Sequence, residues 1–423
     1  MKRSFHILIS SLVALCLAGP VASSRESADI VVASGGGGDF TSIQDALNSL
    51  GPHHRKPVVI LIRNGVYAEK VWIRQSDIAL VGEDRDSTRI IFAELRENWA
   101  REHGGSDWGA GVVNIDTGTT DITLANLTVY NNYGWQNEVF NKHQFAIRGM
   151  GTRIILLHCR VISDGGDALS LWNKQEGMYY HAGCFFEGWV DFVCPRGWCY
   201  ITDSHFFGHN LSASIWHDGD YDRNQKLVIC SSSFDGVPGF PLGRNHRDGQ
   251  IFLVDCRFSE RMADRPIYHP ASSKTEWQWG DRHYYYHCHR DGGDFAWFRD
   301  NLQTADHPPR PEEISARWTF DGKWDPEASM PSVLPAAFPL SPRSGDSHVG
   351  TKNARLTWVA GRNAEAHNVY FGMNEDPEFR GAQQATSYDT GKLSPGTTYF
   401  WRIDEVAGGE VVRGELRSFR TGE

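Results

Sequence analysis

The sequence predicts an all-β protein in which a right-handed parallel β-helix is followed by a small β-sandwich. Three observations predict this class. The 43 Gly, 18 Pro and 12% aromatic residues favour many turns and strands over a helical bundle. Short apolar runs punctuated by Gly and Asn recur between about residues 27 and 308. From about residue 336 onward, short alternating segments are typical of the strands of a sandwich.

A repeat within residues 24–308 predicts the β-helix. Six tetrads share a small or apolar second residue and a Val or Phe at the fourth position: Asn126-Leu127-Thr128-Val129, His158-Cys159-Arg160-Val161, Gly183-Cys184-Phe185-Phe186, Asp203-Ser204-His205-Phe206, Ser231-Ser232-Ser233-Phe234 and Asp255-Cys256-Arg257-Phe258. From Cys159 onward, their second positions follow one another at intervals of roughly 20–30 residues, a period typical of solenoids. Strand-like units at such a period, with no helical half, predict about one solenoid turn per repeat. An ordinary sandwich with accidental similarity is the alternative.

The N-terminus has the pattern of a secretory signal peptide, which we assign to residues 1–23. Lys2 and Arg3 precede an apolar stretch from Ile7 to Ala18, and small residues follow it. This apolar stretch is too short to span a bilayer, and no later one reaches about 18 residues. We therefore expect a secreted protein, extracellular or periplasmic, with no membrane span.

The charge and the cysteine content of the chain indicate which partners and which covalent bonds can be expected. The 42 Lys and Arg against 52 Asp and Glu give a formal net charge of −10, so nucleic-acid binding is not expected. Export permits disulfides, and Cys194 and Cys199 are close enough in sequence to close a small loop. We expect no metal site and no cofactor, because the acidic run at 218–222 lacks the Gly and Glu of an EF-hand and His287-Cys288-His289 lacks a further ligand. We expect a monomer.

The C-terminal quarter is predicted to be a separate unit. Residues 309–335 are Pro-rich and contain Trp, which predicts a linker packed on the β-helix. Residues 336–423 resemble a fibronectin type III module, in which Tyr399 after Ser394-Pro395-Gly396-Thr397 is similar to the tyrosine corner. We expect a spacer or docking role for it rather than a second catalytic one.

Polar residues one repeat apart predict a site on the solenoid. Gln144, Asp167 and Asp191 follow one another at nearly equal intervals that match the repeat, so they are expected to stack on three adjacent turns. Two carboxylates this close do not both ionise easily, which leaves one neutral acid and one carboxylate for acid–base or nucleophilic work. A neighbouring amide could donate to an oxyanion. The alternative is that these are ordinary turn residues.

Several ordered motifs resemble the pectin methylesterase family, from about residue 36 to 330. They are Gly38-Asp39-Phe40-Thr41-Ser42-Ile43-Gln44-Asp45-Ala46-Leu47 (family GDFxTIQxAL), Ile62-Arg63-Asn64-Gly65-Val66-Tyr67-Ala68-Glu69-Lys70-Val71, Gln144-Phe145-Ala146-Ile147-Arg148 (QAVAL), Gly165-Gly166-Asp167-Ala168-Leu169 (YQDTL), Gly188-Trp189-Val190-Asp191-Phe192-Val193 (GTVDFIF) and Leu242-Gly243-Arg244 (LGRPW). The family fold is the right-handed parallel β-helix. GTVDFIF is the most specific of these motifs.

The resemblance implies a role for each matching residue. Asp191 would be the nucleophile that attacks the ester carbonyl, and Asp167 the acid that protonates methanol and then the base that activates water. Gln144 would donate to the oxyanion. Arg244 would hold the nucleophilic carboxylate and lower its pKa. No metal or cofactor is implied.

Three departures from the family pattern concern the substrate more than the fold. Gly166 replaces a Gln that is the second amide at the oxyanion, and Pro195 replaces a Gly after Asp191. Asn245 and His246 replace the Pro and Trp that follow Arg244. Since the missing Trp is a sugar-stacking platform, we expect other side chains to contact the substrate, namely His246, Trp172, Trp189 and Trp216.

The function predicted by the resemblance is hydrolysis of methyl esters on polygalacturonate (pectin) or a related uronide, with release of methanol. Two other classes stay open. One is a β-helix polysaccharide lyase or glycosidase, and the other is a non-catalytic polysaccharide-binding protein, which the change at Gly166 would favour. The products of incubation with methylated pectin distinguish all three.

Overall fold

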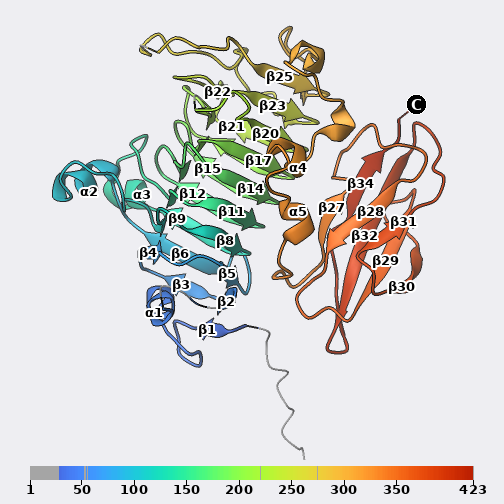
Figure 1. Cartoon of the computed structure of the whole chain (residues 1–423), viewed down its shortest axis with the longest axis horizontal. Coiled ribbons are helices and arrows are strands. Elements are labelled where there is room, and N and C mark those ends of the chain that lie inside the picture. The colour runs from blue at the N-terminus through green and yellow to red at the C-terminus, as the bar shows by residue number, and fades with distance from the viewer. Residues whose placement is uncertain (1–27, 52–53, 55, 220, 274, 423) are drawn as a thin grey trace, which may run out of the picture.

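A computed structural model describes residues 28–422 except 52, 53, 55, 220 and 274. The signal peptide assigned to residues 1–23 lies outside the described residues. The described chain forms a stack of parallel strands, from β1 near one end to β25 near the other, with a set of antiparallel strands beside it (Figure 1). The predicted all-β class and its parallel β-helix are confirmed.

The largest sheet of the β-helix has ten parallel strands among the described residues. In spatial order they are β1 (Ile30–Val32), β2 (Val58–Ile62), β5 (Ile78–Gly82), β8 (Thr120–Ala125), β11 (Thr152–Leu157), β14 (Met178–Ala182), β17 (Trp198–Thr202), β20 (Leu227–Cys230), β23 (Ile251–Val254) and β25 (His283–Tyr286).

Two further parallel sheets complete each turn. The described part of the nine-stranded sheet consists of β3 (Gly65–Tyr67), β6 (Thr88–Phe92), β9 (Thr128–Asn131), β12 (Arg160–Ser163), β15 (Phe185–Gly188), β18 (His205–Gly208), β21 (Ser233–Gly236), β24 (Arg257–Phe258) and β26 (His289–Arg290). The described part of the seven-stranded sheet consists of β4 (Val71–Ile73), β7 (Val113–Ile115), β10 (Ile147–Gly149), β13 (Leu169–Leu171), β16 (Val193–Pro195), β19 (Ile215–Trp216) and β22 (Gly243–Arg244).

The repeated tetrads are the corners that join the ten-stranded sheet to the nine-stranded one. The first residue of each has positive φ, for example 51° at His158 and 51° at Asp255, which turns the chain sharply. The fourth residue points into the core, where successive Phe rings stack. Phe206 lies 5.3 Å from Phe186 and 4.3 Å from Phe234, measured between ring centroids.

Short helices flank the β-helix. α1 (Ile43–Ser49) lies beside β1 and buries Ile43, Ala46 and Leu47 in the core. Ser42 caps α1 by accepting from the backbone of Asp45 at 3.2 Å. α2 (Arg96–Glu102) and α3 (Tyr133–Asn137) lie in the loops that precede β7 and β10. In Figure 1 both extend from the side of the stack, opposite the C-terminal sheets.

The outer face of the ten-stranded sheet carries a second apolar cluster. Its contacts come from η1 (Leu302–Thr304), η2 (Pro311–Glu313), α4 (Ala316–Thr319) and α5 (Pro326–Ser329) and from the chain around them. Phe320, Trp324 and Val333 are buried there against sheet residues such as Tyr200 and Phe252. This segment therefore packs on the β-helix, although the boundaries 309–335 stay a prediction.

The C-terminal part consists of two antiparallel sheets, with all of their strands in the described residues. One contains β27 (Phe338–Ser341), β28 (Arg355–Val359) and β31 (Ser387–Asp389). The other contains β29 (Ala366–Gly372), β30 (Phe379–Gln383), β32 (Thr398–Ala407), β33 (Glu410–Val412) and β34 (Arg417–Arg420). The hydroxyl of Tyr399 accepts from the backbone of Ser394 at 2.9 Å. The fibronectin type III assignment and the boundary at residue 336 stay predictions.

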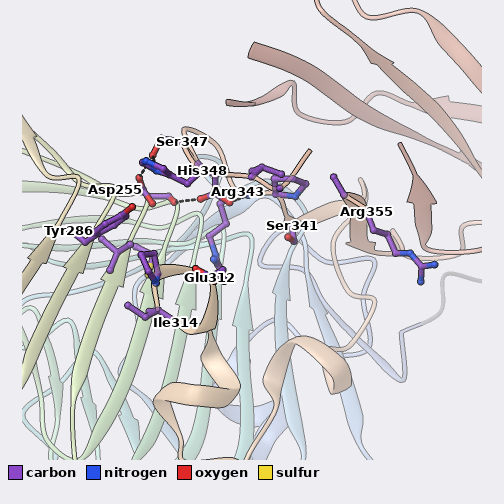
Figure 2. A pocket seen from close by; sticks show the side chains of 18 residues that line it. Asp255, Tyr286, Glu312, Ile314, Ser341, Arg343, Ser347, His348 and Arg355 are labelled. Atoms are coloured by element: carbon purple, nitrogen blue, oxygen red, sulfur yellow. Dashed lines mark hydrogen bonds between the residues drawn. The ribbon is translucent and has the colours of Figure 1, made fainter. Parts of the chain in front are cut away.

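Polar contacts join the C-terminal part to the β-helix. Arg417 in β34 pairs with Asp203, and the Ser347 hydroxyl donates to Asp255 at 3.0 Å. A cavity of about 440 Å³ lies between the two parts. Figure 2 shows Asp255 and Tyr286 of the β-helix on one side of this cavity and Ser347 and His348 beside them.

One sequence-based prediction about covalent structure is wrong. Cys194 and Cys199 are not paired, and all seven described cysteines are free and buried. Cys194 lies in β16, whereas Cys199 lies in β17 of a different sheet. The Sγ of Cys194 contacts Ser170 Oγ at 3.5 Å, so this thiol acts as a packed small side chain.

The Phe stack predicts a strong effect of one core substitution. Phe206→Ala should lower the free energy of unfolding by about 3–5 kcal/mol, because it removes a fully buried ring between two others. Denaturant unfolding followed by far-UV circular dichroism measures the change. Phe379→Ala, at a ring that is 56% exposed, is the matched control. Equal effects of the two substitutions would contradict the assignment of the Phe stack as the core.

Candidate active site

Gln144, Asp167 and Asp191 occupy equivalent positions on consecutive turns. The backbone N–H of Gln144 donates to Gly166 O at 3.1 Å, that of Asp167 to Val190 O at 3.1 Å, and that of Asp191 to Ala213 O at 2.9 Å. Each of these hydrogen bonds joins one turn of the β-helix to the next in the parallel sheet. The predicted stack is therefore present. Adjacent positions in such a stack lie about 4.8 Å apart.

A local turn places the two aspartates just before their strands. Asp167 precedes β13 and Asp191 precedes β16, each by two residues. Both have positive φ, 58° for Asp167 and 52° for Asp191, a conformation that Asp adopts more readily than most residues. Both side chains are nearly buried, since each residue is 8% exposed.

Arg244 holds the Asp191 carboxylate from the edge strand β22. Its Nη2 donates to Asp191 Oδ2 at 2.7 Å, and its Nε donates to Oδ1 at 3.0 Å. This bidentate geometry fixes the plane of the carboxylate as well as its position. The predicted pairing of these two residues is therefore present in the structure.

The pKa of Asp191 differs from the sequence-based expectation. Burial raises it to about 7, and the hydrogen bonds and charge of Arg244 only partly oppose this rise. Burial also raises the pKa of Asp167, against His143, Arg196 and Arg148. The neighbouring charge of Asp167 raises the pKa of Asp191 further, so the two acids titrate as a pair. Both carboxyls therefore keep a proton to a higher pH than an exposed aspartate does.

The predicted role of Gln144 needs a correction. Its side chain is fully buried, and both ends of the amide bind backbone. Nε2 donates to Val139 O at 2.6 Å, and Oε1 accepts from Gly134 N at 3.0 Å. The amide therefore holds the loop around α3 against the β-helix, and it is not the free donor that the sequence predicted.

The structure explains why Gly166 departs from the family pattern. A Cβ at this position would lie 2.8 Å from Val190 O and 2.8 Å from Val190 Cγ1. At Gly165 a Cβ would lie 1.9 Å from Lys142 O. The turn before Asp167 is therefore packed too tightly for a side chain, and a Gln at residue 166 would require backbone movement.

Two of the Trp residues predicted to contact substrate, Trp172 and Trp216, also contact arginines. β13 lies between β10 and β16, so Arg148 and Arg196 approach Trp172 from opposite sides, with guanidinium carbons 4.2 and 3.7 Å from its ring centroid. Trp216 lies 3.9 Å from the Arg196 guanidinium, and its Nε1 donates to His246 Nδ1 at 2.9 Å. Trp172 and His246 are partly exposed, whereas Trp216 is nearly buried, and contact of the three with substrate stays a prediction.

Trp189 belongs to a separate aromatic group at the rim. Its ring lies 5.8 Å from that of His209 and 5.8 Å from that of Phe140. Phe140 is 43% exposed, and Trp135 in α3 is 76% exposed. Trp189 thus stays a candidate for substrate contact, together with these two rings, which the sequence analysis missed.

The sequence analysis also missed Arg148, Arg196 and His143. Nε2 of His143 lies 3.9 Å from Asp167 Oδ1. Arg148, Trp172 and Arg196 follow one another at equal intervals of one repeat, a signal of the same kind as the stack of Gln144, Asp167 and Asp191. Searching for cations two repeats apart would have found Arg148 and Arg196, whereas no such signal marks His143.

Within the described residues, no group of three or more His, Cys, Asp or Glu side chains is arranged to hold a metal ion. The described helices are also too short or too polar to cross a bilayer.

These features define a parallel β-helix protein with a buried pair of carboxylates in a site rich in arginine. Residues 29–213 match the Pectinesterase family. The chain is 26% identical to probable pectinesterase 56 of Arabidopsis thaliana over 207 residues, which cover 46% of this chain and 65% of that protein. It is 27% identical to pectinesterase A of Dickeya chrysanthemi over 179 residues, 41% of this chain and 47% of that protein. The chain is therefore similar to pectinesterases over somewhat less than half of its length.

Solved structures share the fold. A pectin methylesterase from Erwinia chrysanthemi superimposes with a TM-score of 0.57 at 19% identity, covering 71% of this chain and 98% of that one. A pectin methylesterase from carrot gives a TM-score of 0.54 at 19% identity, covering 73% and 98%. The chain thus spans less than two thirds of the length of the curated relatives above, whereas its fold covers nearly all of these solved structures.

The raised pKa of Asp191 predicts how its removal changes stability. Because the folded pKa is about 7 and the usual value 3.8, the folded state loses stability as pH rises between these values. Asp191→Asn removes this loss, so the variant should gain stability relative to the wild type between pH 5 and pH 8, by about 2–3 kcal/mol. Urea unfolding at both pH values measures it, and a difference between the proteins that does not vary with pH would contradict the raised pKa.

Proposed function

We propose that the chain is a secreted esterase that hydrolyses methyl esters of a polyuronate such as pectin. The observation that carries this proposal is the bidentate grip of Arg244 on Asp191, with Asp167 one turn away in the same stack. The similarity to pectinesterases supports the substrate class. The residue roles, the secretion and the monomeric state are part of the same proposal.

The two acids divide the chemistry between them. The ionised carboxylate of Asp191, oriented by Arg244, attacks the ester carbonyl carbon, and the carbonyl π electrons move to its oxygen. When this oxyanion collapses, the bond to the methoxy oxygen breaks, and Asp167 gives its proton to the departing methanol. Asp167 then takes a proton from water, which attacks the acyl group and releases the Asp191 carboxylate and the uronic acid, and this acid loses its proton to solvent to become the uronate.

The environment of the pair suits this division. Burial raises the pKa of both acids, so one of them stays protonated at a pH at which an exposed aspartate would have lost its proton. The pairing with Arg244 favours ionisation of Asp191, whereas Asp167 faces His143 at a longer distance of 3.9 Å. We therefore assign the proton to Asp167 and the negative charge to Asp191.

One observation favours a second function. Gly166 leaves no amide at its position, and the amide of Gln144 binds backbone. A protein that has lost its oxyanion donors would bind methylated polysaccharide without turning it over. This non-catalytic binding is the alternative to the esterase.

Methanol release tests the proposed function. Incubation with highly methylated pectin should release methanol, and Asp191→Asn should lower the rate at least about 10³-fold because the nucleophile is lost. Asp235→Asn, an aspartate of the nine-stranded sheet that pairs with Arg261, is the control. Unsaturated chain ends without methanol would identify a lyase, and binding without either product would identify the non-catalytic alternative.

Arg244 predicts a change in the pH dependence. In the wild type, kcat/KM should fall below about pH 7 as Asp191 takes up a proton. Arg244→Gln removes the group that lowers the pKa of Asp191, so the acidic limb of the profile should move to higher pH. Rates of methanol release from pH 5 to 9 measure this shift. If the acidic limb lies at the same pH in both proteins, it reports the titration of a group other than Asp191.

A further inference from the structure

The esterase step needs a donor for the oxyanion, and the two amides expected in this position are absent or engaged. We propose that Arg196 provides this donor and that the same guanidinium binds the carboxylate of the product. This inference rests on the proposed function. It assigns to Arg196 a role that neither its motif context nor its sequence neighbours indicate.

The backbone places Arg196 on the floor of the site. It directly follows β16, five residues after Asp191, and its N–H donates to Leu171 O at 2.8 Å. It also forms a parallel bridge with Asp218 on the next turn. Arg196 is therefore fixed at both neighbouring turns, on the same sheet as the strands that carry the two acids.

Two tryptophans hold its guanidinium rigidly. The guanidinium carbon lies 3.7 Å from the ring centroid of Trp172 and 3.9 Å from that of Trp216. Contacts this close favour the cation electrostatically and remove its rotational freedom. A donor that is already oriented costs little reorganisation when negative charge develops in the transition state.

The guanidinium has unused hydrogen-bond donors. Within the described chain, Nε and Nη1 of Arg196 are buried and have no hydrogen-bond partner. The Nη1 atom lies 3.8 Å from Asp218 Oδ2, which is beyond hydrogen-bond distance. Arg148, on the other side of Trp172, also has Nε and Nη1 atoms without a hydrogen-bond partner, but its Nη2 donates to Asp107 at 3.2 Å.

A buried cation with open donors is costly unless a partner arrives. The residue is only 7% exposed, and leaving charged donors unpaired costs more than leaving neutral ones unpaired. An oxygen of the substrate would supply that partner. The charge of Arg196 lowers the pKa of both Asp167 and Asp191, which agrees with a position close to both.

The proposed step is balanced without any further group. As an Asp191 oxygen bonds to the carbonyl carbon, the π electrons move to the carbonyl oxygen, and the negative charge passes from the carboxylate to this oxyanion. Arg196 donates to the oxyanion and keeps its own proton. After hydrolysis the same oxygen belongs to the uronate carboxylate, which carries a full charge that the neutral ester lacks. Arg196 should thus stabilise the transition state and product more than the substrate.

Kinetics of two variants test the role in turnover. Arg196→Met should lower kcat for methylated pectin about 10²–10³-fold, with KM changed less than about threefold. Arg196→Lys should recover part of kcat, because it restores the charge without the planar donors. Arg160→Met is the matched control, since Arg160 also stacks on a ring, that of Phe185 at 4.9 Å, but on the nine-stranded sheet. A kcat of Arg196→Met within threefold of the wild type would overturn the proposal.

Calorimetric titration with unesterified trigalacturonate tests the site without turnover. Arg196→Met should weaken binding at least tenfold, whereas Arg160→Met should not. Unchanged binding, or no binding by the wild type, would overturn the product contact. If the wild type binds but releases no methanol, the proposed function fails while Arg196 stands as the carboxylate contact. If Arg196→Met does not fold, Arg196→Lys serves in both measurements and should weaken both kcat and binding.

Discussion

The hydrogen-bonded register between successive turns is the constraint on which the rest of the structure depends. Because each strand pairs in parallel with its equivalent one turn later, residues at the same place in the repeat must stack. In the core this register brings Phe206 onto Phe234. On the surface the same register brings Asp167 beside Asp191, although no local preference favours two carboxylates as neighbours. The repeat thus produces both the packing of the core and the unfavourable proximity of two carboxylates in the site.

Burial and cations on the same sheet determine how readily the two carboxylates ionise. Desolvation raises the pKa of both acids, and Arg244 opposes the rise at Asp191 alone through two direct hydrogen bonds. The asymmetry between the two acids therefore comes from a strand two turns further along the β-helix rather than from their own loops. The tryptophans on the same sheet hold a second cation, Arg196, in a fixed orientation. A small set of side chains on four strands accounts for the charge distribution of the whole site.

The repeat and the stack of polar residues could be predicted because they depend on spacing along the chain. The period predicted the β-helix, and the matching intervals between Gln144, Asp167 and Asp191 predicted their stack. The hydrogen-bond partners and pKa values of individual side chains could not be predicted in this way. The amide of Gln144 binds a loop whose path depends on local packing, and the net pKa of Asp191 depends on burial as well as on charge. Pairs such as Arg417 with Asp203 join distant parts of the chain that share no pattern.

The crowded turn at Gly165 and Gly166 limits how the site can be redesigned. A side chain at residue 166 would collide with the backbone oxygen of Val190, which belongs to the next turn. An amide can therefore be introduced at this position only together with a change that moves the next turn away.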